Sequence, residues 1–447
     1  MTPAFRYTGT CLLLLVVFAS CSPAARIGRA AKPVLEDSAL SRAHVGISIY
    51  DPAKNKVLYE HQANKFFVPA SNTKLFTMYA GMKYLGDSIA GIRYFENDTA
   101  VFLLPTGDPG FLHSDYDRHP VLDFLQQVKK PLYLDDSRWK TSPFGTGWSW
   151  GDYNASYAPE RSAFPAWGNT IRWVKESSGK AAANEHEFDQ SVSIYSIPDI
   201  DWPVRFDPES QRGRFYVLRD QTANNFLIRQ GSDSVGSQSV PYMTNGSQAV
   251  LELLNANYNL NIQPGSLPGT PQTSVIYSRH TDSLLKPLMH RSDNLYAEQV
   301  MLMVAEKLRG VLDESPVLDS LIRTELADIP GNLRWADGSG LSKNNQFTPQ
   351  SMIAILKRLQ DEFGMDRVRA IMATGGEGTI RNFYQRQKGS IYAKTGTLGG
   401  VVALSGYLYT KKNRLLLFSV LVNNHRGNAN AIRRQVEQFI DQVYERY

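Results

Sequence analysis

Strand-like runs at both ends of the chain constrain its fold more than any other feature. Each run is rich in β-branched and aromatic residues and is bounded by short polar turns, which is typical of antiparallel strands. Two runs lie near the N-terminus and three near the C-terminus, so we expect one five-stranded antiparallel sheet built from both ends. The segment between them then interrupts a single domain. The runs are 45–50, 57–61, 390–397, 401–409 and 415–423.

The middle of the chain differs in character from its ends. From about residue 98 to residue 277, short strand-like runs alternate with Gly, Pro, Asn and Ser, and six of the seven tryptophans lie here. We therefore expect mostly β material inserted into an α+β domain. The predicted boundaries are 41–97 and 278–447 for the interrupted domain, 98–165 and 241–277 for a first insert domain, and 166–240 for a second.

Residues 1–21 are predicted to be a targeting signal. Arg6 precedes a run of nine apolar residues, and small residues stand directly before Cys21. The apolar run is too short to span a membrane. Because this arrangement resembles a bacterial lipoprotein cleavage site, we expect a lipid on Cys21 as the only membrane attachment, followed by a tether over 22–40. Secretion with cleavage nearby and no lipid is the alternative.

Cysteine usage and charge exclude several kinds of site. The only cysteines are Cys11 and Cys21, so no disulfide, thiol nucleophile or cysteine-based zinc site is expected in the mature chain. The net charge of +5 is dispersed, and the densest basic cluster, 411–414, has the pattern of a hairpin turn, so nucleic-acid binding has no support. His113 and His119 are better explained by a solvated loop than by a metal site. We expect no metal and no other cofactor.

A candidate nucleophile lies at the start of a predicted helix. Ser71 and Lys74 precede apolar residues at helical spacings, which indicate one buried stripe. A spacing of three places both side chains on one face with their Cβ atoms about 5–6 Å apart, so the amine can reach the hydroxyl. A serine with a base in reach is a nucleophile. Because S-x-x-K occurs by chance in many long proteins, this motif needs further support.

Two further motifs supply that support. Ser292-Asp293-Asn294 is a polar link between two predicted helices, and Lys394-Thr395-Gly396-Thr397 lies in a predicted strand. The order S-x-x-K, S-x-N and K-T-G is the pattern of penicillin-binding proteins and serine β-lactamases. The three motifs together predict a serine acyl-transfer site.

The separation of Ser71 from Ser292 is too long for a compact β-lactamase. Together with segments 106–109, 134–137 and 337–342, it makes the chain resemble the D-alanyl-D-alanine carboxypeptidase/endopeptidase family of the penicillin-binding protein 4 type (peptidase family S13, class C low-molecular-mass penicillin-binding proteins). The resemblance implies a serine β-lactamase/transpeptidase-like domain, with helices on both faces of the sheet, interrupted by a mostly β two-domain insert. It also implies a periplasmic enzyme that cleaves D-Ala-D-Ala and D-Ala-diaminopimelate bonds of peptidoglycan stem peptides and that β-lactam antibiotics inhibit covalently.

The resemblance assigns roles to the motif residues. Ser71 would attack the carbonyl carbon of the penultimate D-Ala, and Lys74 would be the base. Burial and the second cation, Lys394, are expected to lower the pKa of Lys74 toward neutrality. Ser292 would relay a proton to the leaving amine, and the Asn294 amide would hold the substrate backbone.

The strand motif is expected to bind both the oxyanion and the terminal carboxylate of the substrate. The backbone N–H groups of Ser71 and Thr397 would form the oxyanion hole. Lys394, with the hydroxyls of Thr395 and Thr397, would hold the carboxylate. Gly396 would let the substrate backbone approach the strand.

Two more residues are candidates for binding the substrate's side chain. Asp135 matches a family position near the side-chain amine, although a turn aspartate is an equal alternative. Lys343 stands where relatives often have arginine; its amine can meet a carboxylate, but without bidentate geometry.

Two other functions are considered. A β-lactamase or an esterase on the same scaffold would hydrolyse its acyl-enzyme with penicillin rapidly. A non-catalytic, cell-wall-binding lipoprotein is disfavoured because all three motifs are intact.

The predicted anchor is tested by Cys21→Ala. Without the thiol no lipid can be attached, so the variant should appear in the soluble periplasmic fraction, whereas the wild type should sediment with membranes. Cell fractionation and immunoblotting measure this. Recovery of wild-type protein as a soluble species that starts downstream of Cys21 would contradict the prediction.

Overall fold

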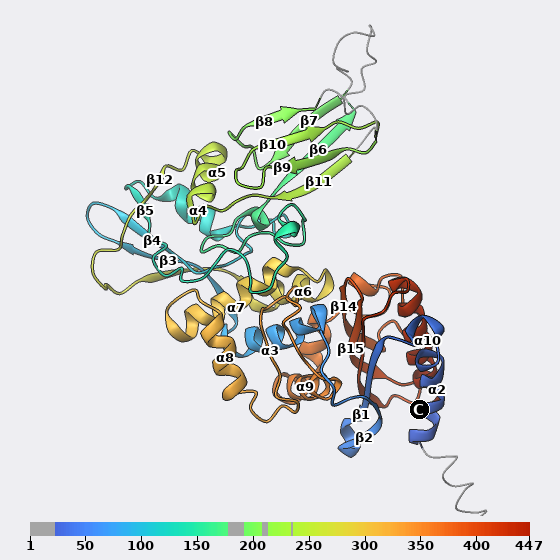
Figure 1. The fold of residues 1–447 in the computed structure, drawn as a ribbon. Helices are drawn as coiled ribbons and strands as arrows, with labels where there is room; N and C mark the ends of the chain where they lie inside the picture. The colour runs from blue at the N-terminus through green and yellow to red at the C-terminus, as the bar shows by residue number, and fades with distance from the viewer. Residues whose placement is uncertain (1–22, 178–191, 208–212, 234–235) are drawn as a thin grey trace, which may run out of the picture. The chain divides into compact units, whose positions relative to one another are not determined.

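The five strands expected from the two ends of the chain form one antiparallel sheet in the computed structural model, which describes residues 23–177, 192–207, 213–233 and 236–447. These strands are β1 (His44–Asp51), β2 (Lys56–His61), β14 (Ile391–Leu398), β15 (Val401–Tyr409) and β16 (Leu415–Asn423), and the helices packed on them are α2 (Pro23–Leu35), α9 (Pro349–Ile371) and α10 (Ala429–Arg446). Their order is β14-β15-β16-β1-β2, so strands from the two ends of the chain meet where β1 pairs with β16 (Figure 1). The predicted sheet and the α+β class are confirmed.

Helices cover both faces of this sheet, as expected (Figure 1). Successive side chains of β1 point to opposite faces. Ile47 and Ile49 pack in an apolar core with α2 and α10. On the other face, a Cβ on Gly46 would lie 2.6 Å from the Phe67 ring and 2.8 Å from Pro349 of α9. Glycine at this position therefore lets α9 begin close to the sheet.

The segment 22–40 is not a tether, contrary to expectation. From Pro23 it forms α2, which packs against α10 and β2 and contributes Ala31 and Val34, both fully buried, to the core. The small, basic composition concealed a stripe of apolar residues spaced three and four apart. Because half of this stripe is alanine, its burial depends on close packing that composition does not reveal. The predicted signal segment 1–21, with Cys21, lies outside the described residues.

The chain divides into two compact units. The first contains the sheet described above and comprises residues up to Tyr79, Lys286–Ser292 and Leu318–Tyr447; the second comprises Ala80–Leu285 and Asp293–Val317. The remaining helices are α3 (Lys74–Tyr84), α4 (Pro120–Gln127), α5 (Gln248–Tyr258), α6 (Thr281–His290), α7 (Asn294–Arg309) and α8 (Ser315–Arg323). Among the described residues, no helix combines the length and the apolar character needed to cross a bilayer.

The second unit contains the remaining β-strands. They are β3 (Ser88–Glu96), β4 (Val101–Pro105), β5 (Leu132–Leu134), β6 (Thr170–Ser177), β7 (Val192–Ile197), β8 (Val204–Phe206), β9 (Tyr216–Arg219), β10 (Phe226–Arg229), β11 (Gly236–Pro241), β12 (Ile262–Pro264) and β13 (Ser274–His280). Within the described ranges they form a sheet of order β12-β5-β4-β3-β13 and two smaller sheets, β8-β10-β9 and β11-β6-β7. The two smaller sheets share one apolar core with residues of α5.

The limits of the two units differ from the predicted domain boundaries at several elements, most clearly at β3 and α7. We had expected β3 in the interrupted domain, but it pairs with β4 and β13 of the second unit. We had expected α7 there as well, yet the amide of Gln299 on α7 donates to the carbonyls of Gly107 and Ser162 in the second unit. The partners of a strand or a helix are set by tertiary contacts between distant segments, so sequence periodicity does not predict them.

A buried ion cluster fixes the first turns of α7 within the second unit. The Arg161 guanidinium lies 2.6 Å from the Glu314 carboxylate and 3.2 Å from that of Glu298 on α7, and all three side chains are buried. A charge left here without its partners would be strongly destabilising, of order 3–5 kcal/mol. The cluster therefore holds the helix that begins at Asn294.

The burial of α2 is tested by Ala31→Glu. The introduced carboxylate would be buried without a partner, so the free energy of unfolding should fall by at least ~2 kcal/mol. Urea denaturation followed by circular dichroism measures the change. Lys32→Gln is the matched control, because the neighbouring side chain is exposed and the exchange should change stability by less than ~0.5 kcal/mol. Equal stability of Ala31→Glu and the wild type would contradict the packing described here.

Candidate active site

Ser71 and Lys74 stand at the junction of a short 3-10 turn with α3. The turn covers Ala70–Thr73 and directly precedes the α-helix, so Ser71 lies in this turn and not in the first turn of the α-helix, as we had expected. The Lys74 amine donates a hydrogen bond to the Ser71 hydroxyl at 3.2 Å and another to the Ser339 carbonyl at 2.6 Å. Its side chain is fully buried. The structure thus brings the predicted nucleophile and base together in a site closed to water on the lysine side.

The turn over 337–342 presents the carbonyl that the buried lysine contacts. The Asp337 carboxylate accepts hydrogen bonds from the backbone N–H groups of Gly340 and Ser342, at 2.8 and 2.7 Å. Gly340 has a φ of +83°, and a Cβ there would lie 2.0 Å from the Ala70 carbonyl oxygen. Only glycine accommodates both the backbone conformation and this close approach.

The second lysine, Lys394, is also fully buried. Its amine donates to the Ser292 hydroxyl at 2.8 Å and to the Thr395 carbonyl at 2.7 Å. Burial, and next the charge of Lys74, hold the pKa of Lys394 well below its usual range. The repulsion between the two ammonium groups is mutual, so the site disfavours a proton on both lysines at once.

Ser292 and the residue directly before Ser71 have left-handed backbone conformations. Ala70, directly before Ser71, has a φ of 48°, and Ser292 has a φ of 63°. A non-glycine residue in this region costs of order 1–3 kcal/mol and persists where the surrounding structure fixes it. The Thr73 hydroxyl contributes to this by donating to the Ala70 carbonyl at 2.9 Å. Strain of this kind is common at functional sites.

Two contacts dock the serine turn onto β14. The Asn72 amide donates to the Lys394 carbonyl at 2.9 Å. A Cβ on Gly396 would lie 2.6 Å from the Pro69 carbonyl oxygen. Glycine here makes room for the chain's own backbone, and the role that we had expected for Gly396 in the approach of substrate stays a prediction. Sequence reasoning missed Asn72, although it stands inside the first motif.

The edge strand β14 directs backbone groups away from its neighbour β15. The N–H of Ala393 donates to the carbonyl of Ala373, outside the sheet, at 3.0 Å. Backbone groups of successive residues alternate in direction, so the N–H groups of Thr395 and Thr397 point to the same side as that of Ala393.

The threonine hydroxyls of β14 have partners that sequence reasoning missed. The Thr395 hydroxyl donates to that of Thr379 at 2.8 Å. The exposed hydroxyl of Thr397 accepts a hydrogen bond from the Arg433 guanidinium of α10 at 2.5 Å. Arg433 occupies a polar position of an amphipathic helix, where arginine is ordinary, so no local signal marks it.

Comparison with known proteins agrees with this geometry. A family model described as the D-Ala-D-Ala carboxypeptidase 3 (S13) family matches residues 29–195 and 261–444, which is more than half of the chain. The chain belongs to the S13 family. The resemblance that the three motifs indicated is thereby confirmed.

Curated relatives and solved structures of this kind align along most of the S13 chain. It is 26% identical over 436 residues to a D-alanyl-D-alanine carboxypeptidase of Actinomadura sp. (strain R39), covering 89% of this chain and 80% of the relative. It is 24% identical over 440 residues to the D-alanyl-D-alanine carboxypeptidase DacB of Haemophilus influenzae, covering 86% of each. The crystal structure of penicillin binding protein 4 (dacB) from H. influenzae is similar in fold, with a TM-score of 0.70 at 20% identity, over 94% of this chain and 99% of that one.

Two predicted site residues of this S13 chain, Asn294 and Asp135, belong to the second unit. Asn294 begins α7, and its amide donates to the Tyr157 carbonyl at 2.8 Å. The Asp135 carboxylate accepts hydrogen bonds from the backbone N–H groups of Ser137 and Leu267, at 3.0 and 2.6 Å. Burial raises the pKa of Asp135, but these donors outweigh it and leave the pKa below its usual range. The Asp135 carboxylate therefore stabilises the turn through these two hydrogen bonds.

Lys343, the other predicted side-chain contact, lies in the first unit directly after the 337–342 turn. Its side chain is exposed, and no described residue forms an ion pair with it. The roles of Lys343, Asp135 and Asn294 toward a substrate stay predictions.

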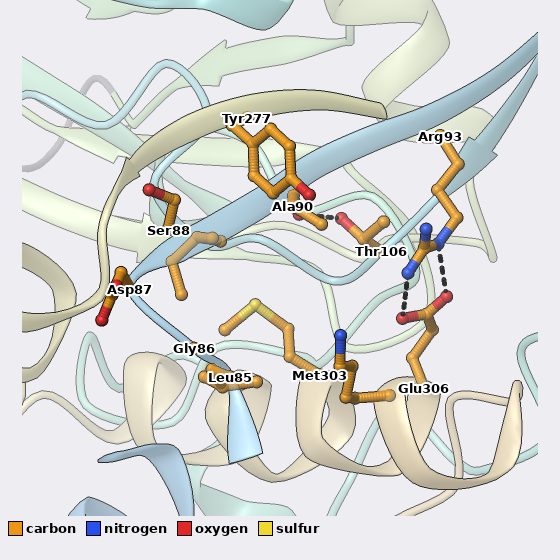
Figure 2. Close-up of a pocket in the computed structure, with 12 residues that line it drawn as sticks. Leu85, Gly86, Asp87, Ser88, Ala90, Arg93, Thr106, Tyr277, Met303 and Glu306 are labelled. Atoms are coloured by element: carbon orange, nitrogen blue, oxygen red, sulfur yellow. Dashed lines mark hydrogen bonds and ion pairs between the residues drawn. The ribbon is translucent and has the colours of Figure 1, made fainter. Parts of the chain in front are cut away.

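The second unit contains a cavity of about 460 Å³ that none of the predicted site residues lines. Figure 2 shows Arg93 and Glu306 facing one another beside it, with Tyr277 and Ser88 farther along the wall. The Arg93 guanidinium lies 2.8 Å from the Glu306 carboxylate, and that of Arg138 lies 3.1 Å from it. The Arg93 pair connects β3 with α7, and the Arg138 pair connects the segment after β5 with α7, so we assign both a role in packing.

The burial of Lys394 predicts a pH dependence of stability. Because its pKa is lower in the folded protein than in the unfolded chain, the unfolded chain binds more protons at pH values between the two, and stability rises with pH. Lys394→Met removes this penalty. Urea denaturation should therefore show the free energy of unfolding of the wild type rising relative to that of the variant, by up to about 1.4 kcal/mol per pH unit, as the pH increases toward about 10.4, the pKa of a lysine in the unfolded chain.

Lys343→Met is the matched control, because that lysine is exposed, and its stability relative to the wild type should not change with pH. A difference between wild type and Lys394→Met that stays constant over this pH range would contradict the assignment.

Proposed function

We propose that this S13 protein is a serine D,D-carboxypeptidase that also acts as a D,D-endopeptidase on peptidoglycan. The observation that carries the proposal is the contact of the Ser71 hydroxyl with the buried amine of Lys74 at 3.2 Å. The substrates would be stem peptides that end in D-Ala-D-Ala or are cross-linked through D-Ala-diaminopimelate. Family membership and the two D-alanyl-D-alanine carboxypeptidase relatives support this choice.

Acylation follows from the hydrogen bonds of the two lysines. Ser71 Oγ attacks the carbonyl carbon of the penultimate D-Ala, and neutral Lys74 takes the hydroxyl proton. The C–N bond then breaks, and the proton taken by Lys74 passes through the Ser292 hydroxyl, which Lys394 contacts, to the leaving amine. Water hydrolyses the ester, releases the shortened peptide and restores the Ser71 hydroxyl.

The backbone N–H groups of Ser71 and Thr397 would stabilise the oxyanion. The direction of the Thr397 N–H, away from β15, supports this role. Each donor of such a pair contributes roughly 3–4 kcal/mol to transition-state stabilisation in well-studied hydrolases. Thr395 and Thr397 would also face the substrate with their hydroxyls, and Asn294 would hold its backbone.

Asp135 and Lys343 are proposed to bind the zwitterionic end of a diaminopimelate side chain. The lowered pKa of Asp135 supports the proposal because the carboxylate stays charged at neutral pH, although two backbone donors already use it. Binding energy at this end of the substrate would orient the scissile bond.

Export to the periplasm and attachment through a lipidated Cys21 complete the proposal. A substrate outside the cytoplasm requires export, and the targeting pattern of residues 1–21 supports it. The packing of α2 leaves few residues between Cys21 and the folded domain, so a lipid on Cys21 would hold this unit close to the membrane surface.

The acyl-enzyme is tested with labelled penicillin. A β-lactam keeps its leaving group tethered, so the adduct should be stable and should map to Ser71 by peptide mass spectrometry. Ser71→Ala should abolish the label and the cleavage of purified muropeptides, with unchanged thermal unfolding. Ser38→Ala, an exposed serine, is the control and should label fully. Persistent labelling of Ser71→Ala would place the chemistry elsewhere, and rapid loss of label would favour a β-lactamase.

The same muropeptides test the substrate. Release of D-Ala and cleavage of cross-linked dimers should both appear in the product masses. A peptide with a free diaminopimelate-like terminus should be cleaved faster than the acetylated tripeptide that ends in D-Ala-D-Ala, and Asp135→Asn should reduce that preference while retaining one acceptor for the turn. Equal rates of cleavage of both peptides by the wild type would contradict the proposed role of Asp135 in substrate specificity and leave the acyl-transfer assignment intact.

A further inference from the structure

The buried position of Lys394 raises the question of which cation meets the substrate's carboxylate. We had expected Lys394 to bind it together with the threonines of β14. Instead its amine is fully buried and donates to the Ser292 hydroxyl and the Thr395 carbonyl. Its lowered pKa suits proton transfer better than attraction of an anion. The carboxylate therefore needs a positive charge closer to solvent.

Arg433 of α10 supplies a positive charge beside β14. One terminal nitrogen donates to the Thr397 hydroxyl at 2.5 Å, and the other donates to the Asn430 amide oxygen at 2.5 Å. The Thr397 side chain is exposed and that of Arg433 is partly exposed, so a ligand can reach both. All of these groups belong to the first unit, with Ser71 and Lys394.

No described carboxylate forms an ion pair with Arg433. Among the residues that the structure describes, its contacts are the neutral oxygens of Thr397 and Asn430. The neighbouring Arg434 has a different environment, because its guanidinium lies 2.6 Å from the Glu437 carboxylate and stacks over the Phe383 ring. Partial burial lowers the pKa of Arg433, yet an arginine stays protonated at neutral pH. A partly desolvated cation with neutral partners attracts an anion strongly.

Thr397 connects this cation to the reacting centre. Its N–H points away from β15, toward the proposed oxyanion, and its hydroxyl contacts Arg433. In a D-Ala-D-Ala peptide, the terminal carboxylate follows the scissile carbonyl by one residue. The same spacing holds in a D-Ala-diaminopimelate cross-link, where a carboxylate stands on the carbon that bears the scissile nitrogen. The backbone N–H of Thr397 can thus face the scissile carbonyl of either substrate while its hydroxyl faces the carboxylate.

We propose that Arg433 binds the carboxylate adjacent to the scissile bond, through its guanidinium and the Thr397 hydroxyl, and so selects substrates with a free carboxylate there. This inference rests on the acyl-transfer function proposed above. Arg433 is a specificity residue that contacts the substrate, whereas Lys394 serves the proton transfer.

The proposal is tested with a pair of peptides that differ only at the carboxylate. The wild type, Arg433→Gln, Arg433→Lys and Arg434→Gln are assayed on an acetylated tripeptide that ends in D-Ala-D-Ala and on its C-terminal carboxamide. Arg433→Gln should lower kcat/KM for the acid ~10- to 100-fold, mainly through KM, because one charged hydrogen-bonding partner is lost. For the carboxamide it should change kcat/KM less than ~2-fold. Arg433→Lys should recover part of the loss on the acid.

Arg434→Gln is the matched control on the same turn of α10 and should behave as the wild type on both peptides. The rates of acylation by penicillin and by its methyl ester, measured by mass spectrometry of the protein, compare a free with a blocked carboxylate without requiring turnover. An equal loss of kcat/KM on the acid and on the carboxamide would overturn the proposal, because Arg433 would then only position Thr397. An Arg433→Gln variant with the kcat/KM of the wild type on the acid would overturn it as well. If the wild type itself fails to react with the acid peptide and with penicillin, the acyl-transfer function fails instead.

Discussion

The burial of two lysine amines beside two serine hydroxyls is the constraint on which this site depends. Lys74 contacts Ser71 and Lys394 contacts Ser292, and neither amine has access to water. Burial and mutual repulsion disfavour the charged state of the pair, and the pKa of Lys394 falls accordingly. An amine whose proton is held less tightly is more often available as a base, so the unfavourable electrostatics and the proposed chemistry have the same origin.

Contacts from several segments hold these side chains in place. The Asp337 turn presents a carbonyl to Lys74, and the Asn72 amide joins the serine turn to β14. Two close backbone approaches, at Gly340 and Gly396, bring these segments together from distant parts of the sequence. The left-handed conformations of Ala70 and Ser292 show that the local backbone is held away from its preferred state.

Charge is divided between buried and exposed positions of the same strand. Lys394 is buried and faces a hydroxyl, whereas Thr397, three residues later, is exposed and meets Arg433 of α10. A site that transfers protons needs a cation that can become neutral, and lysine in a dry environment serves this purpose. Arginine stays protonated, and its planar guanidinium fits a carboxylate, so Arg433 near the surface suits the recognition proposed above. The K-T-G motif alone does not separate these two tasks.

Several parts of the protein were predictable from local sequence pattern. Alternation and turn residues predicted the five strands of the main sheet, and the three motifs indicated Ser71, Lys74, Ser292 and Lys394 together with the S13 family. These features were accessible because strand periodicity and motif spacing are properties of short segments. Only the tertiary structure decided that α2 is part of the core, that β3 and α7 belong to the second unit, and that Arg433 meets Thr397. The physical reason is that each of these three features depends on which surfaces pack together across long separations in the chain. The residues near an alanine stripe or a single helical arginine do not indicate which distant segment it contacts.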